Sequence, residues 1–271
     1  MKLAVSNVAW YPKQIDGFIR LLQDLQVHGL EFAPSMEWDE PADVPFAERK
    51  GFRDKIEAAG LRIIGLQALL YTRQDLKLFE SQAKRIEVLE YCKKLMELCY
   101  DLGGEVLVFG SPRNRSLNGL AKDAAWDISV EFFRKIGKAA TDVGVYFCIE
   151  PLEQTVTDFI NSVAEAEKLI RDAGSPSGLG LHIDTKGLIE ENEVEASYLS
   201  ESIKHAKHIH LNDPGLMPPG STGYDHRAIS KIIAGSGYDR FASIEMRRQE
   251  PDISHAIIRA VEYVKSVYNF K

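Results

Sequence analysis

The stretch that decides the fold is VGVYFCIEP, residues 143–151, in which a glycine, a short apolar run and a carboxylate follow one another. A glycine just past a helical segment marks its C-terminal end, because left-handed backbone costs glycine little there. The apolar run has the β-branched and aromatic residues of a strand buried on both faces. The stretch therefore predicts a helix, a tight turn and a parallel strand that ends at Glu150.

This unit recurs along the whole chain. Apolar runs predict eight strands, at residues 2–8, 29–34, 61–69, 105–112, 145–151, 178–185, 206–213 and 240–246. Amphipathic segments predict eight helices, at 13–27, 45–59, 81–102, 122–143, 161–173, 193–205, 226–236 and 253–268. Glycines at 28–29, 59–60, 102–104, 143–144 and 173–174 are read as helix ends. Eight such units in 271 residues favour one (β/α)₈ TIM barrel domain over residues 1–271 rather than an open sheet, and no glycine-rich dinucleotide motif follows the first strand.

Composition narrows the class of protein. A net charge of −7 and a pI near 5.6 disfavour nucleic acid and anionic membranes as partners. No apolar stretch reaches the ~20 residues of a membrane span, and the N-terminal apolar run is too short for a secretion signal. A cytoplasmic location is expected. Cys92, Cys99 and Cys148 form no metal or disulfide motif and are expected to be reduced core residues.

Four successive strands end in residues of metal-binding type: Glu150 in CIEP, Asp184 in HIDT, His210 in HIHLND and Glu245 in SIEM. They are 34, 26 and 35 residues apart, about one strand–helix unit each, so a barrel brings them to the same end. Three carboxylates and one imidazole suit Mn²⁺, Mg²⁺ or Co²⁺ in octahedral geometry with two positions left for substrate oxygens, and Zn²⁺ is a further candidate. We expect these four residues to bind a divalent metal.

Other polar residues near the strand ends are candidates for supporting or substrate-binding roles. His182 and His208 lie two residues before a predicted ligand, one layer deeper, and are expected to be core or supporting groups. Two guanidinium groups in GSPRNR, 110–115, could clamp a phosphate or carboxylate, or could be solvated and pair with nearby acids. Loops at 70–81 and 212–226 are expected to cover the mouth. The substrate-binding candidates are Asn7, Trp10, Glu31, Gln67, Arg113, Arg115, Lys186 and Arg247.

Over nearly its whole length the sequence resembles the xylose-isomerase-like TIM-barrel family of sugar and sugar phosphate isomerases and epimerases, which includes the ketose 3-epimerases. The resemblance rests on IEPLEQTVTDFINS (149–162), LGLHIDTKGLIEENE (179–193), HIHLND (208–213), PPGSTGYDHRAISKII (218–233) and SIEM (243–246). VSNVAW (5–10), LQALLY (66–71) and VFGSPRNRS (108–116) are similar to a subgroup of sugar phosphate isomerases. The resemblance implies that Glu150, Asp184, His210 and Glu245 bind the metal and that Glu150 and Glu245 transfer the proton.

The sequence departs from the ketose 3-epimerases at three positions that contact sugar in that group. Gly187 stands where they carry a histidine, Leu216 where they carry an arginine and Val156 where they carry a glutamate. The four predicted metal ligands are retained, whereas the three residues that contact sugar in that group are not. We therefore expect the substrate to be held by different groups.

The expected function is a divalent-metal-dependent sugar or sugar phosphate isomerase or epimerase that acts through a metal-stabilised cis-enediolate, with Glu150 and Glu245 as acid and base. Alternatives are a metal-dependent dehydratase or a Schiff-base aldolase using Lys186, both lyases. An apurinic-endonuclease-like hydrolase with a multi-zinc cluster is disfavoured by only seven scattered histidines and by the acidic charge. A non-catalytic sugar binder is a further alternative, and barrels of this kind often form homodimers.

Overall fold

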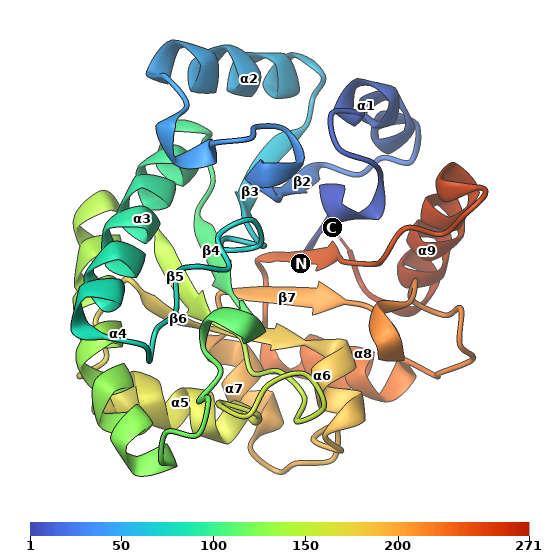
Figure 1. Cartoon of the computed structure of the whole chain (residues 1–271). Helices are drawn as coiled ribbons and strands as arrows, with labels where there is room; N and C mark the ends of the chain where they lie inside the picture. The colour runs from blue at the N-terminus through green and yellow to red at the C-terminus, as the bar shows by residue number, and fades with distance from the viewer. Residues whose placement is uncertain (271) are drawn as a thin grey trace.

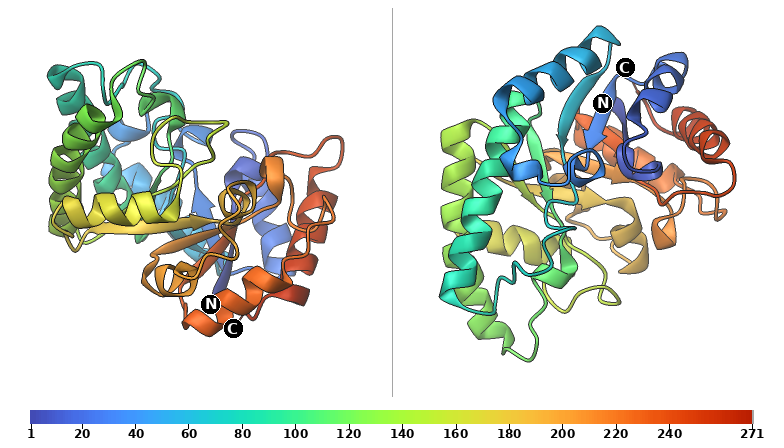
Figure 2. Two further views of the ribbon diagram at one scale, coloured as in Figure 1. Left: turned by 90° about the horizontal axis from the view of Figure 1, so that it is seen from below. Right: turned by 45° about the horizontal axis from the view of Figure 1, so that its top comes forward.

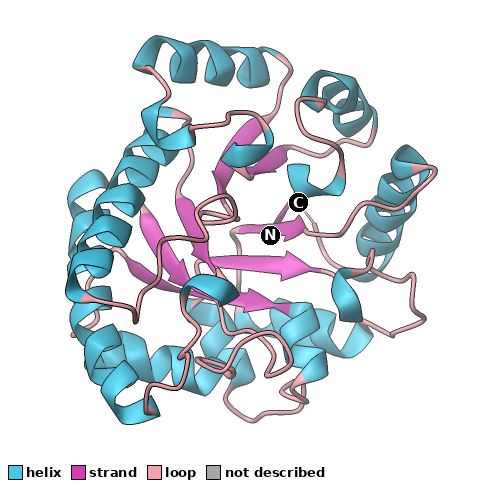
Figure 3. Cartoon of the chain, viewed as in Figure 1, coloured by secondary structure: helices cyan, strands magenta, loops and turns pink. Residues whose placement is uncertain are grey.

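The structure is a computed structural model that describes residues 1–270. Eight parallel strands close into a barrel in the order β1 to β8, with β8 pairing back to β1, and helices surround it (Figures 1 and 3). The strands are β1 (Lys2–Ser6), β2 (Gly29–Phe32), β3 (Arg62–Leu66), β4 (Val106–Phe109), β5 (Tyr146–Ile149), β6 (Leu179–Asp184), β7 (His208–Leu211) and β8 (Phe241–Ile244). The predicted (β/α)₈ barrel is confirmed.

Most strands end earlier than the apolar runs suggested. The run at 61–69 pairs only as far as Leu66, and the run at 105–112 only as far as Phe109. Beyond the strands the chain often turns into a short 3₁₀ helix, and in several cases proline starts it, because proline cannot donate to a strand ladder. These 3₁₀ helices are η1 (Asn7–Ala9), η2 (Pro34–Met36), η4 (Pro112–Asn114) and η5 (Pro214–Leu216) at the mouth, and η3 (Pro41–Asp43) farther along.

The helices agree with the predicted segments except after β6. They are α1 (Ile15–Asp24), α2 (Phe46–Ala58), α3 (Gln82–Asp101), α4 (Lys122–Val143), α5 (Val163–Asp172), α6 (Thr185–Glu190), α7 (Leu199–His205), α8 (Arg227–Ser236) and α9 (Ile253–Val267). The helix predicted at 193–205 begins only at Leu199, and the unpredicted α6 starts directly at the end of β6. Asp184 caps α6, because its side chain accepts from the Lys186 amide at 2.8 Å. The long helices α3 and α4 lie side by side outside the barrel (Figure 2).

Glycine ends some of the helices as predicted, but Gly29 has a different role. Gly144 is the left-handed C-cap of α4, with φ of 90°. Gly29 instead begins β2, where a Cβ would come within 2.7 Å of Ala4 Cβ and 2.8 Å of the Phe241 ring. The interpretation of Gly29 as a helix end is therefore wrong. The residue is needed because neighbouring strands approach closely.

The loop at 212–226 is fixed by a buried carboxylate. Asp213 accepts from the backbone amides of Gly220 at 2.9 Å and Thr222 at 2.8 Å, and lies 2.7 Å from His226 Nε2. The other ring nitrogen of His226 lies 2.7 Å from the Tyr268 hydroxyl in the chain after α9. Both ends of this loop are therefore held against the barrel.

The loop at 70–81 is fastened to its neighbour after β4. The Asn114 side chain donates to the backbone carbonyls of Arg73 and Leu76, each at 2.8 Å, and the Asn114 backbone carbonyl accepts from the Leu78 amide at 2.8 Å. The three cysteines are buried and free of disulfides in the described chain, as expected. None of the described helices is long and apolar enough to cross a membrane.

Candidate metal centre

The carboxyl ends of four neighbouring strands bring the four predicted ligands together. Glu150 follows β5 and Glu245 follows β8, while Asp184 ends β6 and pairs in register with His210 of β7. Each of the four residues offers one ligand atom, and these atoms all lie within 4.8 Å of one another. The regular spacing in the sequence thus becomes one cluster with the composition of a divalent-metal site.

His210 turns one ring nitrogen toward the carboxylates. Its Nδ1 lies 3.2 Å from Glu245 Oε2 and 3.8 Å from Glu150 Oε1, yet within residues 1–270 this buried atom has no hydrogen-bond partner. A buried polar atom left without a partner costs free energy. An ion bound by this nitrogen and the carboxylates would remove that cost, so the residues present fit a divalent cation.

The pKa values of the clustered carboxyl groups also favour a bound cation. Burial raises the pKa of Glu150 to about 8, with Glu245 and Asp184 adding to the rise and His210 opposing it. Burial also raises the pKa of Asp184 to about 6, with Lys186 opposing the rise and Glu245 adding to it. Carboxylates this close do not all ionise without a counter-ion. A bound cation would allow them to do so.

The GSPRNR turn after β4 holds Glu150 in place. A Cβ on Gly110 would overlap Glu150 Oε2, so this carboxylate occupies space that only glycine leaves free. The Arg115 guanidinium is 1 % exposed and donates to the backbone carbonyl of Glu150 at 2.8 Å and to that of Ile160 at 3.5 Å. Arg115 therefore supports the strand end that carries Glu150. Of the two arginines of this turn, Arg113 lines the cavity and Arg115 does not.

A second polar layer, here termed the inner tier, lies beneath the four ligands and consists of Ser6, Glu31, Gln67, His182 and His208, each at most 4 % exposed. Glu31 Oε1 lies 2.9 Å from His208 Nε2, and Gln67 Nε2 lies 3.4 Å from Glu31 Oε2 and 2.5 Å from Ser6 Oγ. Burial alone would raise the pKa of Glu31, but the histidines hold it well below its ordinary value. The two imidazoles therefore favour the charged form of Glu31.

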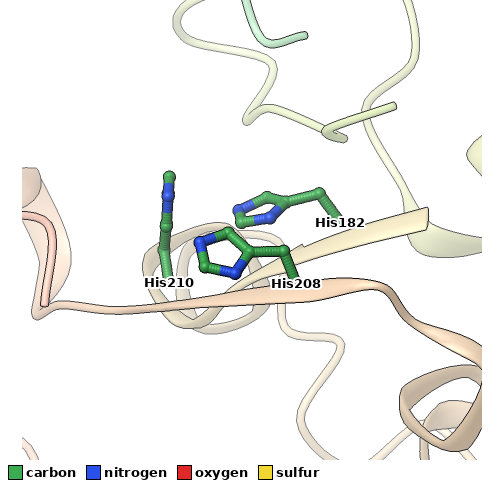
Figure 4. Close-up of side chains that lie close together, drawn as sticks. All are labelled: His182, His208 and His210. Carbon is green, nitrogen blue, oxygen red and sulfur yellow. The ribbon is translucent and has the colours of Figure 1, made fainter. Parts of the chain in front are cut away.

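Three imidazoles gather at the junction of the two layers. His182 on β6 and His208 and His210 on β7 place their rings on the same side of the two strands (Figure 4). His182 Nε2 lies 3.6 Å from Glu150 Oε1, and neither ring nitrogen of His182 has a hydrogen-bond partner in the described part of the chain. His182 and His208 thus lie one layer deeper than the ligands, as the sequence indicated.

A cavity of about 650 Å³ opens above the cluster. Its charged lining consists of Arg113, Glu150, Glu153, Asp184, Lys186 and Glu245. Its remaining lining consists of Gln67, Ala68, Tyr71, Gln74, Val108, Gly110, Ser111, Pro112, Asn114, Leu152, Val156 and Leu216. Of the predicted substrate-binding residues, Gln67, Arg113 and Lys186 therefore face this cavity.

The other substrate-binding candidates are not part of this lining. The Asn7 side chain exchanges two hydrogen bonds with the backbone of Ala33, at 2.7 and 3.2 Å. Trp10 is 1 % exposed and stacks on Phe18. Arg247 Nε lies 3.0 Å from Met217 Sδ. Their role in substrate binding stays a prediction.

Lys186 is tied to acids on two sides. Its ammonium group bonds to the buried Glu153 and lies 4.0 Å from Glu190 Oε2. Burial would lower its pKa, but Asp184 and Glu153 outweigh burial and raise it. Glu153 was not singled out from the sequence. Its only signal there is a second carboxylate three residues after Glu150 in IEPLE.

Comparison with known proteins places this arrangement in a family. Among solved structures, the Escherichia coli 3-keto-D-glucoside 4-epimerase is 17% identical to this chain with a TM-score of 0.79. The alignment covers 98% of this chain and 99% of the epimerase chain. The Clostridium cellulolyticum D-psicose 3-epimerase, solved with D-tagatose, is 16% identical with a TM-score of 0.81 and the same coverage. At these identities the likeness concerns the fold. The family described as "Xylose isomerase-like TIM barrel" matches residues 19–267, and the chain belongs to this family.

Proposed function

We propose that this protein is a divalent-metal-dependent sugar isomerase or epimerase in which Glu150 and Glu245 exchange a proton with a substrate carbon. The observation that carries the proposal is the proximity of these two carboxylates to His210 Nδ1, at 3.8 and 3.2 Å, in the lining of the cavity. A divalent cation, when bound there, supplies Lewis acidity to adjacent oxygens of a hydroxy-carbonyl sugar.

The proton transfer falls to the two glutamates. They come from different strands, β5 and β8, and both line the cavity. One carboxylate removes the proton from carbon and the other returns it. Return to the opposite face of the same carbon gives epimerisation, and return to the neighbouring carbon gives isomerisation.

The charge of the cavity favours a neutral sugar over a sugar phosphate. Its lining has four acids and two bases, so one dication leaves no net positive charge for a phosphate. The Lys186 ammonium group already bonds to Glu153, and the Arg115 guanidinium already donates to backbone carbonyls. Neither group is therefore free to bind a phosphate. Arg113 is the one lining arginine, and it is exposed to solvent. We therefore infer a substrate recognised through hydroxyl groups.

A lyase on the same site is the second candidate, in its dehydratase form. The Schiff-base form is disfavoured, because a nucleophilic amine must be deprotonated and the acids around Lys186 raise its pKa. Solved structures of similar fold, a D-psicose 3-epimerase with D-tagatose and a D-allulose 3-epimerase with D-allulose, support the epimerase class.

Hydrogen exchange at carbon tests the proposal. The Mn²⁺-loaded protein is incubated in D₂O with a panel of ketoses and aldoses and with their phosphates, and carbon-bound hydrogen is followed by NMR. Deuterium entry with a neutral sugar, abolished in Glu150→Gln and Glu245→Gln and retained in Glu193→Gln, is expected. Loss of water from the substrate would identify the dehydratase, and exchange confined to phosphates would contradict the neutral-sugar inference.

A further inference from the structure

Glu31 is the one acid of the inner tier, and it contacts two histidines at once. Its Oε1 lies 2.8 Å from His210 Nε2 and 2.9 Å from His208 Nε2. One carboxylate oxygen shared by two imidazole nitrogens is placed to accept a hydrogen bond from each Nε2–H group. The proton of His210 is thereby placed on Nε2, on the side of the ring away from Glu150 and Glu245.

The opposite nitrogen of His210 is left facing the ligand cluster. Nδ1 points at Glu245 and Glu150 and lacks a hydrogen-bond partner among the described residues. A metal ion binds an imidazole through a nitrogen lone pair, so with the proton held on Nε2 the nitrogen available to a metal is Nδ1. A carboxylate that accepts from the far nitrogen also increases the basicity of a metal-binding histidine and fixes its ring.

We propose that Glu31 is a positioning residue, which holds His210 in the Nε2–H form so that Nδ1 is free to bind the metal. This role rests on the proposed function only through the metal. Glu31 itself is 0 % exposed and lies outside the described cavity lining, so it acts through His210 and not on the substrate. It comes from β2, and the four ligands come from β5 to β8, so its effect crosses the barrel interior.

The partners of Glu31 fix its orientation. His208 Nε2 shares Oε1, and Gln67 Nε2 approaches Oε2 at 3.4 Å. His182, His208 and His210 are close enough to one another to hold an ion among themselves. Glu31 Oε1 already accepts from two of these rings, however, so we assign this cluster to positioning. One metal ion per chain is the expected stoichiometry.

Imidazole nitrogen NMR on the unmodified protein gives the first test. Histidines are labelled with ¹⁵N in the Zn²⁺-loaded protein, and the His210 signals are assigned by their loss in His210→Gln. The expected result is a proton on Nε2, shifted downfield by its hydrogen bond to a carboxylate, and a metal-shifted Nδ1. A proton on Nδ1 with the metal on Nε2 would overturn the proposal, and so would two ions per chain.

The Glu31→Gln variant gives the second test and keeps the side-chain volume. Mn²⁺ affinity, followed by the EPR signal of the free ion, is expected to fall by about 10–100-fold. The matched control is Glu193→Gln, an acid that is 8 % exposed and accepts from the Val163 amide and the Tyr198 hydroxyl. It should keep the affinity of the unmodified protein.

The two proposals fail in different ways. If the unmodified protein binds no divalent metal, the proposed function fails. If it binds metal and Glu31→Gln, shown to be folded by circular dichroism, binds equally well, the role of Glu31 fails while the proposed function stands.

Discussion

The charged side chains at the two mouths of the barrel are arranged differently. At the N-terminal mouth, Glu105 pairs with Arg62 and lies 3.6 Å from Arg240, while Lys207 and Arg240 sit over the Tyr146 ring at 4.9 and 5.0 Å. Each of these charges has a partner within the protein. At the C-terminal mouth, three carboxylates lie around one imidazole nitrogen that has no hydrogen-bond partner among residues 1–270.

This difference separates charges that pair within the barrel from charges arranged as a candidate binding site. Ion pairs and ring contacts at the N-terminal mouth change the free energy of folding little, and their side chains fill space there. Crowded carboxyl groups with raised pKa values at the C-terminal mouth are unfavourable until something binds. We infer that the second arrangement is present because of its ligand, and the predictions below test the two mouths against each other.

Removing a direct ligand should have the largest effect. Asp184→Asn keeps a side chain that can cap α6 but removes the charge, and His210→Ala removes Nδ1. Each is expected to lower Mn²⁺ affinity by more than the about 100-fold limit typical of an indirect partner. Isothermal titration measures it, and His205→Ala, an exposed histidine paired with Glu201, is the control. Unchanged Mn²⁺ affinity in both variants would contradict the assignment of a metal centre to these residues.

Displacing Glu150 without changing its chemistry should come next. A methyl group in Gly110→Ala overlaps Glu150 Oε2, so the carboxylate must move. A shift of about 1 Å in a catalytic group can cost about 100-fold in rate. Hydrogen exchange into the substrate measures the loss. Gly51→Ala in α2, where a Cβ meets nothing within 4 Å, should leave the rate unchanged and stabilise the helix by about 1 kcal/mol.

The contrast between Gly110 and the four ligands shows what the sequence can reveal. The barrel and the clustering of four residues of metal-binding type were predictable because parallel strands fix one spacing, and Glu150, Asp184, His210 and Glu245 each occur once per unit. The contact between Gly110 and Glu150 depends on how two neighbouring strand ends face each other. No local pattern encodes it.

Glu31 and Arg115 show the same limit at longer range. Glu31 is 179 residues from His210 in sequence, so their hydrogen bond exists only once the barrel has closed. Arg115 was a candidate for a substrate clamp or for a solvated position, and in the structure its buried guanidinium donates to the carbonyl of Glu150. Residue type gave the correct end of the barrel in both cases. The direction of the side chain required the packed structure.

The apparent affinity for metal should increase gradually as the pH rises. In the metal-free protein the pKa of Glu150 is raised to about 8 and that of Asp184 to about 6, so protons compete with the ion below these values. Apparent affinity is therefore expected to rise by up to about tenfold per pH unit between pH 6 and 8, with proton release on binding. Titrations in buffers of different ionisation enthalpy measure that release. A pH-independent affinity in this range would contradict the crowded site.

The same shifts predict how the metal-free protein responds to pH. A carboxyl group whose pKa is raised by folding favours the folded state when protonated. For Glu150 this contribution is complete below its ordinary value of 4.5 and is lost as pH rises through about 8. The rise in melting temperature on adding Mn²⁺ should therefore be larger at pH 8 than at pH 5. An equal rise at both pH values would count against the shift.

The N-terminal mouth should give the smallest effect. Glu105→Gln removes the acid between Arg62 and Arg240, but the Glu105 side chain is 51% exposed and solvent screens the pairs. We expect the free energy of unfolding to fall by at most about 1 kcal/mol, measured by urea denaturation. Mn²⁺ affinity should not change, because the charge that is lost lies at the far end of the barrel from the ligands. If Glu105→Gln weakened metal binding as strongly as Glu31→Gln, charge anywhere in the barrel would control the site, and the distinction between the two mouths would fail.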